Sequence, residues 1–162
     1  MSDLRLAAAR RRLAESSDQS DALEAIREIV SNLLGSEQMV LFAFDRQTAN
    51  LRMVWSFGID AQECNPLRIL SDVCLRRVTR GECHVELPHD NRSGSAAKTR
   101  AFVPLRHANR TVGVLAILRL LPQKLGFDRL DMDLLGFLSI EAGKALLGSL
   151  ANAPPGESEV RA

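Results

Sequence analysis

Short apolar runs, short segments that mix apolar and polar residues, and longer amphipathic stretches follow one another along this chain, and the first two kinds predict five β-strands. An apolar run of about five to eight residues is too short for a buried helix but suits a strand that is covered on both faces. In the second strand, large apolar side chains occupy every second position from Leu51 to Phe57, which predicts one strongly apolar face. The predicted strands span residues 39–44, 51–57, 83–87, 101–105 and 111–118.

Four other segments place apolar residues three and four positions apart, which is the spacing of one buried helix face. Gly35 and Gly81 follow two of these segments and are natural helix ends. Residues 88–98 are almost free of apolar side chains and predict a surface loop. The predicted helices span residues 4–15, 21–34 and 69–80, with a last helix from Asp128 or Asp131 to about residue 150.

Antiparallel strands with helices on both faces predict an α+β sandwich. The hairpin "F-V-P-L-R…R-T-V-G-V-L-A-I-L", the strand "L-R-M-V-W-S-F-G-I" and the helix start "G-F-D-R-L-D-M-D-L-L" follow one another at a spacing that resembles the GAF domain family over about residues 21–150. The resemblance implies a GAF-like central antiparallel sheet of five or six strands. It also implies N- and C-terminal helices on one face and a middle helix plus loops on the other.

Under this interpretation the chain has three parts: a helical extension over residues 1–17, a GAF-like domain over 18–151 and a disordered tail over 152–162. The segment that leads into the middle helix, residues 66–73, lacks the glycine common in the family, and no cyclic-nucleotide or bilin-attachment motif is visible. Roadblock-type dimerisation modules share a similar order of elements, and PAS domains are also sensor folds of this size. The long loop before the last hairpin and the long terminal helices favour GAF.

Composition narrows the function classes. The formal net charge is +1 and aromatic residues make up 4% of the chain, which argues against nucleic acid as a partner. No apolar run is long enough to span a membrane and the N-terminus has no signal-peptide order, so we expect a cytoplasmic, bacterial protein. Three cysteines without a CxxC motif predict reduced thiols.

Neither a metal site nor a catalytic group stands out, and no cofactor is expected. Cys83 and His84 are neighbours on a strand and should point to opposite faces, so they cannot easily bind one ion. Asp128 and Asp131 suit helix capping better than metal binding. A stand-alone GAF domain also resembles free methionine-(R)-sulfoxide reductases, for which Cys64 and Cys83 are the candidate thiols, although the local sequences do not match that family's cysteine contexts.

A ligand pocket is expected between the sheet, the middle helix and the 88–98 loop. A local excess of arginine in the middle of the chain favours an anionic ligand or an acidic partner, with Arg77 or His89 holding the anion; a solvated basic face is the simpler interpretation. The candidate pocket residues are Met53, Trp55, Phe57, Cys74, Arg77, His89 and Phe102, each of which also suits an ordinary core or surface position.

The last helix is apolar around most of its circumference, so it must bury more than one side. We expect a homodimer through this helix, and the alternative is an N-terminal helix that folds back within one protomer. The candidate interface residues are Met132, Phe137, Ile140, Gly143 and Leu147.

Three functions remain open. The first is a non-enzymatic sensory or regulatory module that acts in trans on a regulatory protein partner, with or without modulation by a small ligand. The others are a thiol-dependent reductase and a structural dimerisation adaptor with a filled core.

Overall fold

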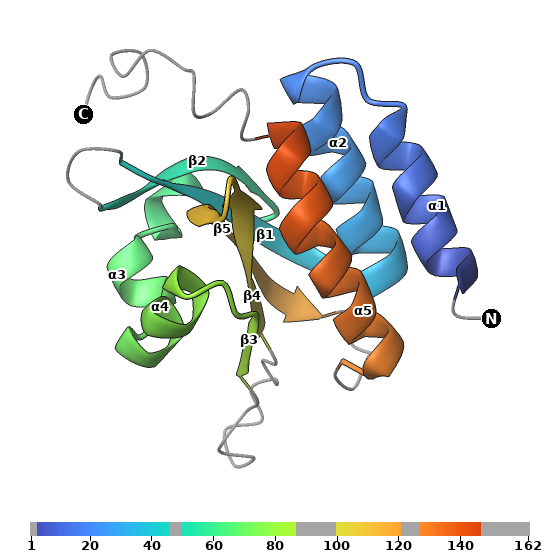
Figure 1. Cartoon of the computed structure of the whole chain (residues 1–162). Coiled ribbons are helices and arrows are strands. Elements are labelled where there is room, and N and C mark those ends of the chain that lie inside the picture. The colour runs from blue at the N-terminus through green and yellow to red at the C-terminus, as the bar shows by residue number, and fades with distance from the viewer. Residues whose placement is uncertain (1–2, 46–49, 87–99, 121–126, 147–162) are drawn as a thin grey trace.

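The computed structural model describes residues 3–45, 50–86, 100–120 and 127–146, which form a sheet with helices on both faces (Figure 1). This confirms the predicted α+β class. The five strands are antiparallel, in the order β2-β1-β5-β4-β3. They are β1 (Ser36–Phe44), β2 (Leu51–Phe57), β3 (His84–Glu86), β4 (Arg100–His107) and β5 (Arg110–Leu120). The predicted loop at 88–98 and the predicted tail lie outside the described residues.

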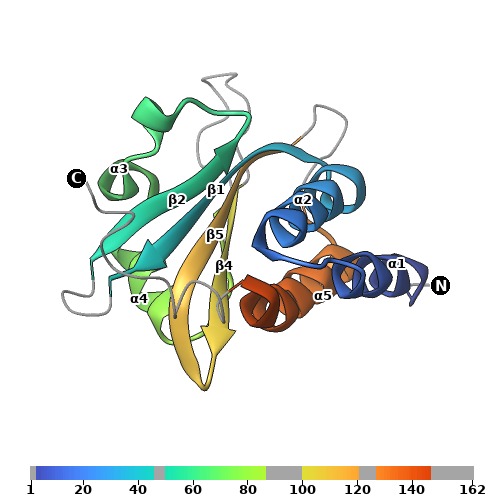
Figure 2. The same cartoon turned by 90° about the horizontal axis from the view of Figure 1, so that it is seen from above.

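Three helices cover one face of the sheet, and we call them the helix layer (Figure 2). They are α1 (Asp3–Ala14), α2 (Gln19–Ile29) with a π-helical continuation (Val30–Leu34), and α5 (Arg129–Phe137) with a π-helical continuation (Leu138–Ala142). Their apolar sides bury one continuous core against alternate residues of β1, β4 and β5. The predicted placement of the N- and C-terminal helices on one face is therefore confirmed.

Short polar side chains cap these helices, as the sequence predicted for Asp128 and Asp131. Asp18 caps α2, where its Oδ1 accepts a hydrogen bond from the Asp21 backbone N–H at 2.8 Å. Asp128 and Asp131 form a reciprocal capping box at the start of α5. Gly35 ends the π-helical continuation of α2 at φ 82°, a left-handed conformation that favours glycine.

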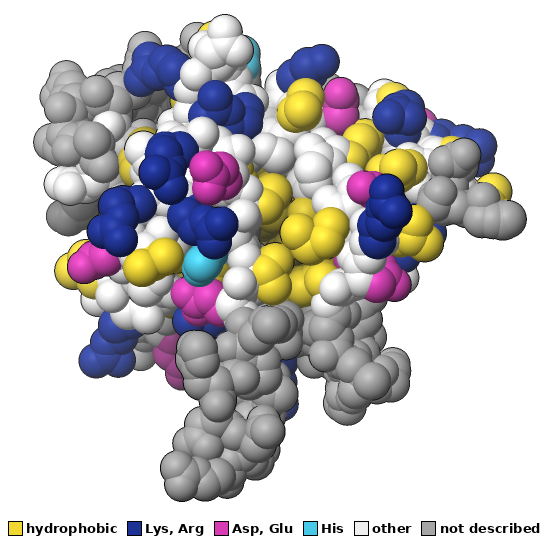
Figure 3. Space-filling model, turned by 60° about the horizontal axis from the view of Figure 1, so that its bottom comes forward, with side chains coloured by type: hydrophobic (Ala, Val, Ile, Leu, Met, Phe, Trp, Pro, Cys, Tyr) yellow, Lys and Arg dark blue, Asp and Glu magenta, His cyan; other side chains and the backbone are white. Residues whose placement is uncertain are grey.

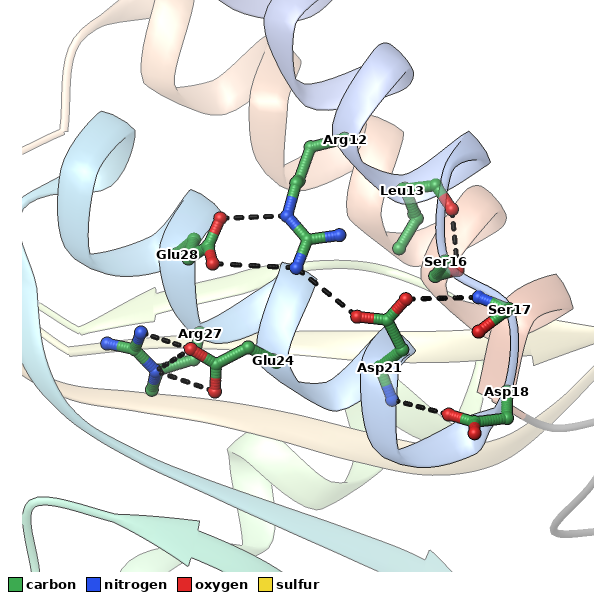
Figure 4. A network of polar contacts seen from close by, with 9 residues as sticks. All are labelled: Arg12, Leu13, Ser16, Ser17, Asp18, Asp21, Glu24, Arg27 and Glu28. Atoms are coloured by element: carbon green, nitrogen blue, oxygen red, sulfur yellow. Dashed lines mark hydrogen bonds and ion pairs between the residues drawn. The ribbon is translucent and has the colours of Figure 1, made fainter.

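Ion pairs join α1 to α2 in the monomer (Figure 4). Arg12 Nε donates to Glu28 Oε1 at 2.8 Å, and its Nη2 lies 3.4 Å from Asp21 Oδ1. Asp21 also accepts from the Ser17 backbone N–H, so the link between the two helices is tied to the same carboxylate. The N-terminal helix thus folds back onto its own protomer, which was the alternative to a dimer contact.

The opposite face carries a 3₁₀ turn (Ala61–Glu63), α3 (Pro66–Ile69) and α4 (Asp72–Thr79). The predicted single helix over 69–80 is wrong, because Leu70 leaves the helical region at φ −105° and ψ 123°. Ser71 then caps a new helix by accepting the Cys74 backbone N–H at 3.1 Å. Pro66 occupies the first turn of α3, a position that needs no amide donor.

The predicted single apolar face of β2 is also wrong, because a β-bulge interrupts its pairing with β1. Trp55 pairs with Leu41, whereas Met53 pairs with Phe42, so Val54 is the extra residue. The bulge reverses the alternation: Met53 packs against the core beneath α3 and α4, and Trp55 packs against the core of the helix layer. We call the side of the sheet that carries α3 and α4 the middle-helix face.

Close contacts fix α5 on β4. The Ser139 hydroxyl donates to the Pro104 carbonyl at 2.5 Å. A Cβ built on Gly143 would lie 2.2 Å from the Arg106 carbonyl oxygen, so only glycine permits this approach. At the other end of the helix the fully buried Asp131 carboxylate accepts from Arg5 Nη2 at 2.5 Å, which joins α1 to α5. The position of α5 therefore depends on backbone contact and one buried ion pair.

Candidate regulatory site

A single carboxylate joins three elements at the β3 edge of the sheet. Glu86 on β3 accepts from Arg100 Nη2 on β4, with 2.5 Å between the Arg100 nitrogen and Glu86 Oε1. Its Oε2 lies 3.4 Å from the Ser71 hydroxyl, which caps α4, and 3.3 Å from His84 Nε2. We call Ser71, Arg77, His84, Glu86 and Arg100 the Glu86 cluster. The cluster links the start of α4 to the two edge strands.

His84 lies at the centre of this cluster and is 8% exposed. Its ring stacks on Phe102 with the two centroids 6.1 Å apart. Arg77 Nη1 lies 3.4 Å from His84 Nδ1. Because a guanidinium can only donate, Nδ1 must accept, and Nε2 is then the nitrogen that carries the proton toward Glu86. The imidazole therefore lies between Arg77 on α4 and the Glu86 carboxylate on β3.

Arginine side chains gather over the middle-helix face (Figure 3, left of the view), with acidic side chains and a histidine among them. Arg100 lies over the Phe102 ring at 5.5 Å from its centroid, which adds a cation–π contact to the pair with Glu86. Arg77 also approaches Glu82, with 3.4 Å between Arg77 Nε and Glu82 Oε1. Arg100 therefore contacts both the Phe102 ring and the Glu86 carboxylate. Arg77 lies between His84 and Glu82.

Apolar side chains fill the space between the cluster and the sheet. Phe42, Cys74, Val78 and Phe102 are each 0% exposed there. Among the described residues, two depressions lie on the other face, against the helix layer. The expected pocket on the middle-helix face is therefore packed as far as the described residues extend, and its polar rim is the Glu86 cluster.

The structure brings four of the seven candidate pocket residues to this face. Met53, Cys74, Arg77 and Phe102 lie on it, with Arg77 in the cluster and Phe102 beneath it. The β-bulge places Trp55 on the helix-layer side. Phe57 also faces that side, with the Arg27 guanidinium 5.1 Å from its ring centroid. His89 lies outside the described residues.

Sequence reasoning missed Glu86 and Ser71, and treated His84 only as a metal or nucleophile candidate. Arg100 was noted only as part of a basic excess. A carboxylate on a short strand beside a histidine at spacing two was the available signal, since residues i and i+2 share one face of a strand. Nothing local indicated Ser71, which lies fifteen positions from Glu86.

The thiols have environments that suppress reactivity. Burial raises the pKa of Cys64, raises that of Cys74 to about 12 and raises that of Cys83 to about 11. A nucleophilic thiol needs the opposite shift, toward thiolate at neutral pH. Cys83 packs against the helix-layer core while His84 stacks on Phe102, so the predicted opposite orientation of this pair is confirmed.

The described residues offer neither a metal site nor a membrane-spanning helix. No group of three or more His, Cys, Asp or Glu side chains in that part of the chain is placed to hold a metal ion. Within the same residues, every helix is too short or too polar to cross a membrane.

The candidate interface residues on the last helix differ in how exposed they are. Met132 is 40% exposed and Ile140 is 52% exposed. Phe137 is buried within the protomer, with the Arg10 guanidinium of α1 5.5 Å from its ring centroid. Gly143 is buried against Arg106. Leu147 lies outside the described residues. Two of the five residues therefore remain available to a partner on α5.

Comparisons with known proteins agree on the fold. The family model described as "GAF domain" matches residues 18–147. The structure is similar to the GAF domain of an Acinetobacter phosphoenolpyruvate-protein phosphotransferase at 15% identity and a TM-score of 0.67, covering 95% of this chain and 99% of that one.

The GAF domain of the corresponding protein from Coxiella burnetii gives the same identity and TM-score, with coverages of 93% and 95%. The GAF domain of a putative sensor histidine kinase from Pseudomonas syringae pv. tomato is 14% identical with a TM-score of 0.60, covering 93% of this chain and 89% of that one. No curated protein matches the sequence.

Proposed function

Since this chain belongs to the GAF domain family, a family of sensory and regulatory modules found in signalling proteins, we propose that it is a cytoplasmic regulatory module acting in trans on a protein partner. We further propose that a small anionic ligand modulates it at the Glu86 cluster. The observation that supports this is the Glu86 carboxylate itself, which accepts from Arg100 and lies beside donors on Ser71 and His84.

An incoming carboxylate or phosphate group would compete with Glu86 for these donors. Arginine binds both groups with two parallel hydrogen bonds, so Arg100 is the natural first contact. Displacement of Glu86 would release Ser71, which caps α4, and His84, which connects Arg77 to β3. The outer side of α4 would then shift relative to the sheet, and that shift is the signal a protein partner would read.

Calorimetric titration with inorganic phosphate and with succinate tests the anion site. Glu86→Gln removes the competing charge, so we expect it to tighten anion binding by about tenfold. Arg100→Ala removes the main donor and should weaken binding by about tenfold or more. Arg68→Ala is the matched control, because Arg68 is exposed on α3 and makes no ion pair among the described residues. Equal affinities for all four proteins would contradict the site.

One observation favours a second candidate, the dimerisation adaptor without a ligand. The middle-helix core is fully packed, with Val40, Phe42 and Phe102 at 0% exposure, and leaves an anion only the rim. Failure of every anion to bind, together with partner binding that is unchanged in Glu86→Gln, would favour the adaptor. The reductase alternative is not proposed, since each thiol has a raised pKa.

A further inference from the structure

Strand β2 is an apolar edge strand. It ends the sheet, and only β1 pairs with it among the described residues. Its seven residues include one charge, at Arg52, and every one of them remains partly exposed. Phe57 is 36% exposed. The described residues make no backbone hydrogen bonds to the outer edge of β2. Its large apolar residues are Leu51, Met53, Val54, Trp55 and Phe57.

Such an edge attracts another strand. Its outward N–H and C=O groups have no backbone partner among the described residues, and proteins normally protect such edges with charged residues, proline or a covering segment. β2 has a single charge and no proline. A helix could bury the apolar side chains, but only a strand would also pair the backbone groups. The chemistry of this edge therefore calls for an extended, mostly apolar segment.

The β-bulge sets which side chains share a face. Val54 and Trp55 both pack toward the helix layer. By strand alternation Arg52 lies on that same side, and Phe57 pairs with Met39, a residue of the helix-layer core. The other face carries Leu51 and Met53, which pack against the middle-helix core, and Ser56, which pairs with Val40 of that core.

We propose that β2 pairs antiparallel with β2 of a second copy, about a two-fold axis that passes between Val54 and Trp55. Side chains directly opposite each other must lie on the same face of a sheet. This register satisfies that rule throughout, and a two-fold axis through Val54 itself does not, since it opposes Met53 to Trp55. The pairs formed are Arg52 with Phe57, Met53 with Ser56 and Val54 with Trp55.

The face pattern of β2 is self-complementary, which favours a second copy as the occupant. In this register Arg52 faces Phe57 of the second copy, whose ring already lies beside Arg27 of its own protomer, and the two Arg52 side chains do not meet. Apolar side chains meet apolar ones at the centre of the interface. In an isologous contact the β2 edge of each protomer pairs with the β2 edge of the other. The two five-stranded sheets then form one continuous sheet.

The axis is perpendicular to the sheet, so both helix layers lie on the same side of the dimer. A depression lined by Leu23 and Trp55, with a polar rim on α2, adjoins this edge on the helix-layer side. The two depressions would then meet across the axis. This inference is independent of the anion site, and it replaces α5 as the main contact between copies.

A charge exchange tests both the contact and its register. Phe57→Lys places a positive charge opposite Arg52 of the second copy, at two symmetric positions, and should weaken dimerisation by about tenfold or more. Adding Arg52→Glu to that variant should restore the dimer, because the two substituted side chains then face each other with opposite charges. Within one strand these positions lie about 17 Å apart, so the rescue cannot occur inside a protomer. Sedimentation equilibrium measures the dissociation constant.

Ile140→Lys is the matched control on α5, where the side chain is 52% exposed, and it should leave the dimer intact. A monomer at every concentration, rescue that fails in a folded double variant, or loss of the dimer in Ile140→Lys alone would each overturn the proposal. The wild-type protein gives a second measurement, in case a variant does not fold. Hydrogen exchange in residues 51–57 should slow with rising concentration, and the emission of Trp55, the only tryptophan, should change in parallel. Concentration-independent exchange there would equally overturn it.

Discussion

The two faces of the sheet are held in different ways. The helix layer is fixed by a backbone approach at Gly143, the Ser139 bond to Pro104 and the buried pair of Asp131 with Arg5. The middle-helix face carries two short helices that break at Leu70, and its link to the sheet edge runs through Glu86. One face is therefore fixed by close backbone contact, while the other carries at its edge the polar contact on which the proposed anion site rests.

The largest expected effect is in the helix layer. Gly143→Ala introduces a Cβ at 2.2 Å from the Arg106 carbonyl oxygen, and backbone on both sides must move. We expect a loss of about 3 kcal/mol in unfolding free energy, measured by urea denaturation. Gly136→Ala is the control on the same helix, since nothing lies within 4 Å of its Cβ. It should stabilise the protein by about 0.5 to 1 kcal/mol through helix propensity alone. Equal effects would remove the argument for a fixed α5.

The reactivity of two thiols gives a chemical comparison of the two faces, because Cys83 packs against the helix-layer core and Cys74 lies in the core of the middle-helix face. Burial raises the pKa of Cys83 from 9.0 to about 11, so its thiolate fraction at pH 8 is lower than in the unfolded chain by about a hundredfold. Native Cys83 should react with iodoacetamide more slowly by that factor. Cys74, with a pKa raised to about 12, should react more slowly still. Rates come from mass spectrometry of quenched samples.

The raised pKa values of Cys74 and Cys83 also determine whether stability rises or falls with pH. The unfolded chain ionises its thiols above about pH 9 and the folded chain does so only near pH 11 or 12. The contribution of these thiols to stability is thus complete below pH 9 and is lost as the pH rises. Faster labelling of Cys74 than of Cys83 would contradict the ordering and would show that α4 opens from the sheet.

A smaller effect is expected at the polar link. His84→Ala removes the stack on Phe102 and the connection from Arg77 to Glu86. It should cost about 1 to 2 kcal/mol, and hydrogen exchange should accelerate in α4 but not in α2. His107→Ala, at an exposed position on β4, serves as the control. Uniform acceleration over both faces would argue that the link has no local role.

The smallest expected effect is in the hairpin of β4 and β5, whose strands contribute residues to the cores on both faces of the sheet. Ala108 and Asn109 have φ of 52° and 66°, as in a two-residue turn whose central residues are left-handed. Ala108→Gly relieves a conformation that disfavours a Cβ and should stabilise the protein by about 0.5 kcal/mol. Thermal unfolding measures the gain. Because the hairpin belongs to both cores, exchange should slow equally in α2 and α4.

Local patterns were enough to predict most of the fold. The hydrophobic patterns predicted all five strands, and Asp128 shows how a cap residue predicted where a helix starts. Two errors have one origin. The bulge at Val54 and the break at Leu70 are each a single irregular residue, and neither changes the local hydrophobic pattern enough to be detected.

The site was less accessible to sequence reasoning. Arg77 and Phe102 were identified as candidates, but the carboxylate that organises them was not. Ser71, Glu86 and Arg100 lie on different elements and meet only because β3 and β4 pair and α4 packs beside them. Local propensity carries no information about such contacts. Trp55 was placed on the wrong side for the same reason that the bulge was missed.

The π-helical turn at Leu138–Ala142 has a consequence for how sequences of this kind diverge. A π turn holds one residue more than an α turn, and so it absorbs the shift of about 100° around the helix axis that one extra residue would cause in a regular α-helix. Without the π turn, the same residues would carry Gly143 away from Arg106 by that angle. A one-residue deletion at the exposed Ile140 would regularise the turn while keeping the buried side chains in phase, so length variation is most readily accommodated there.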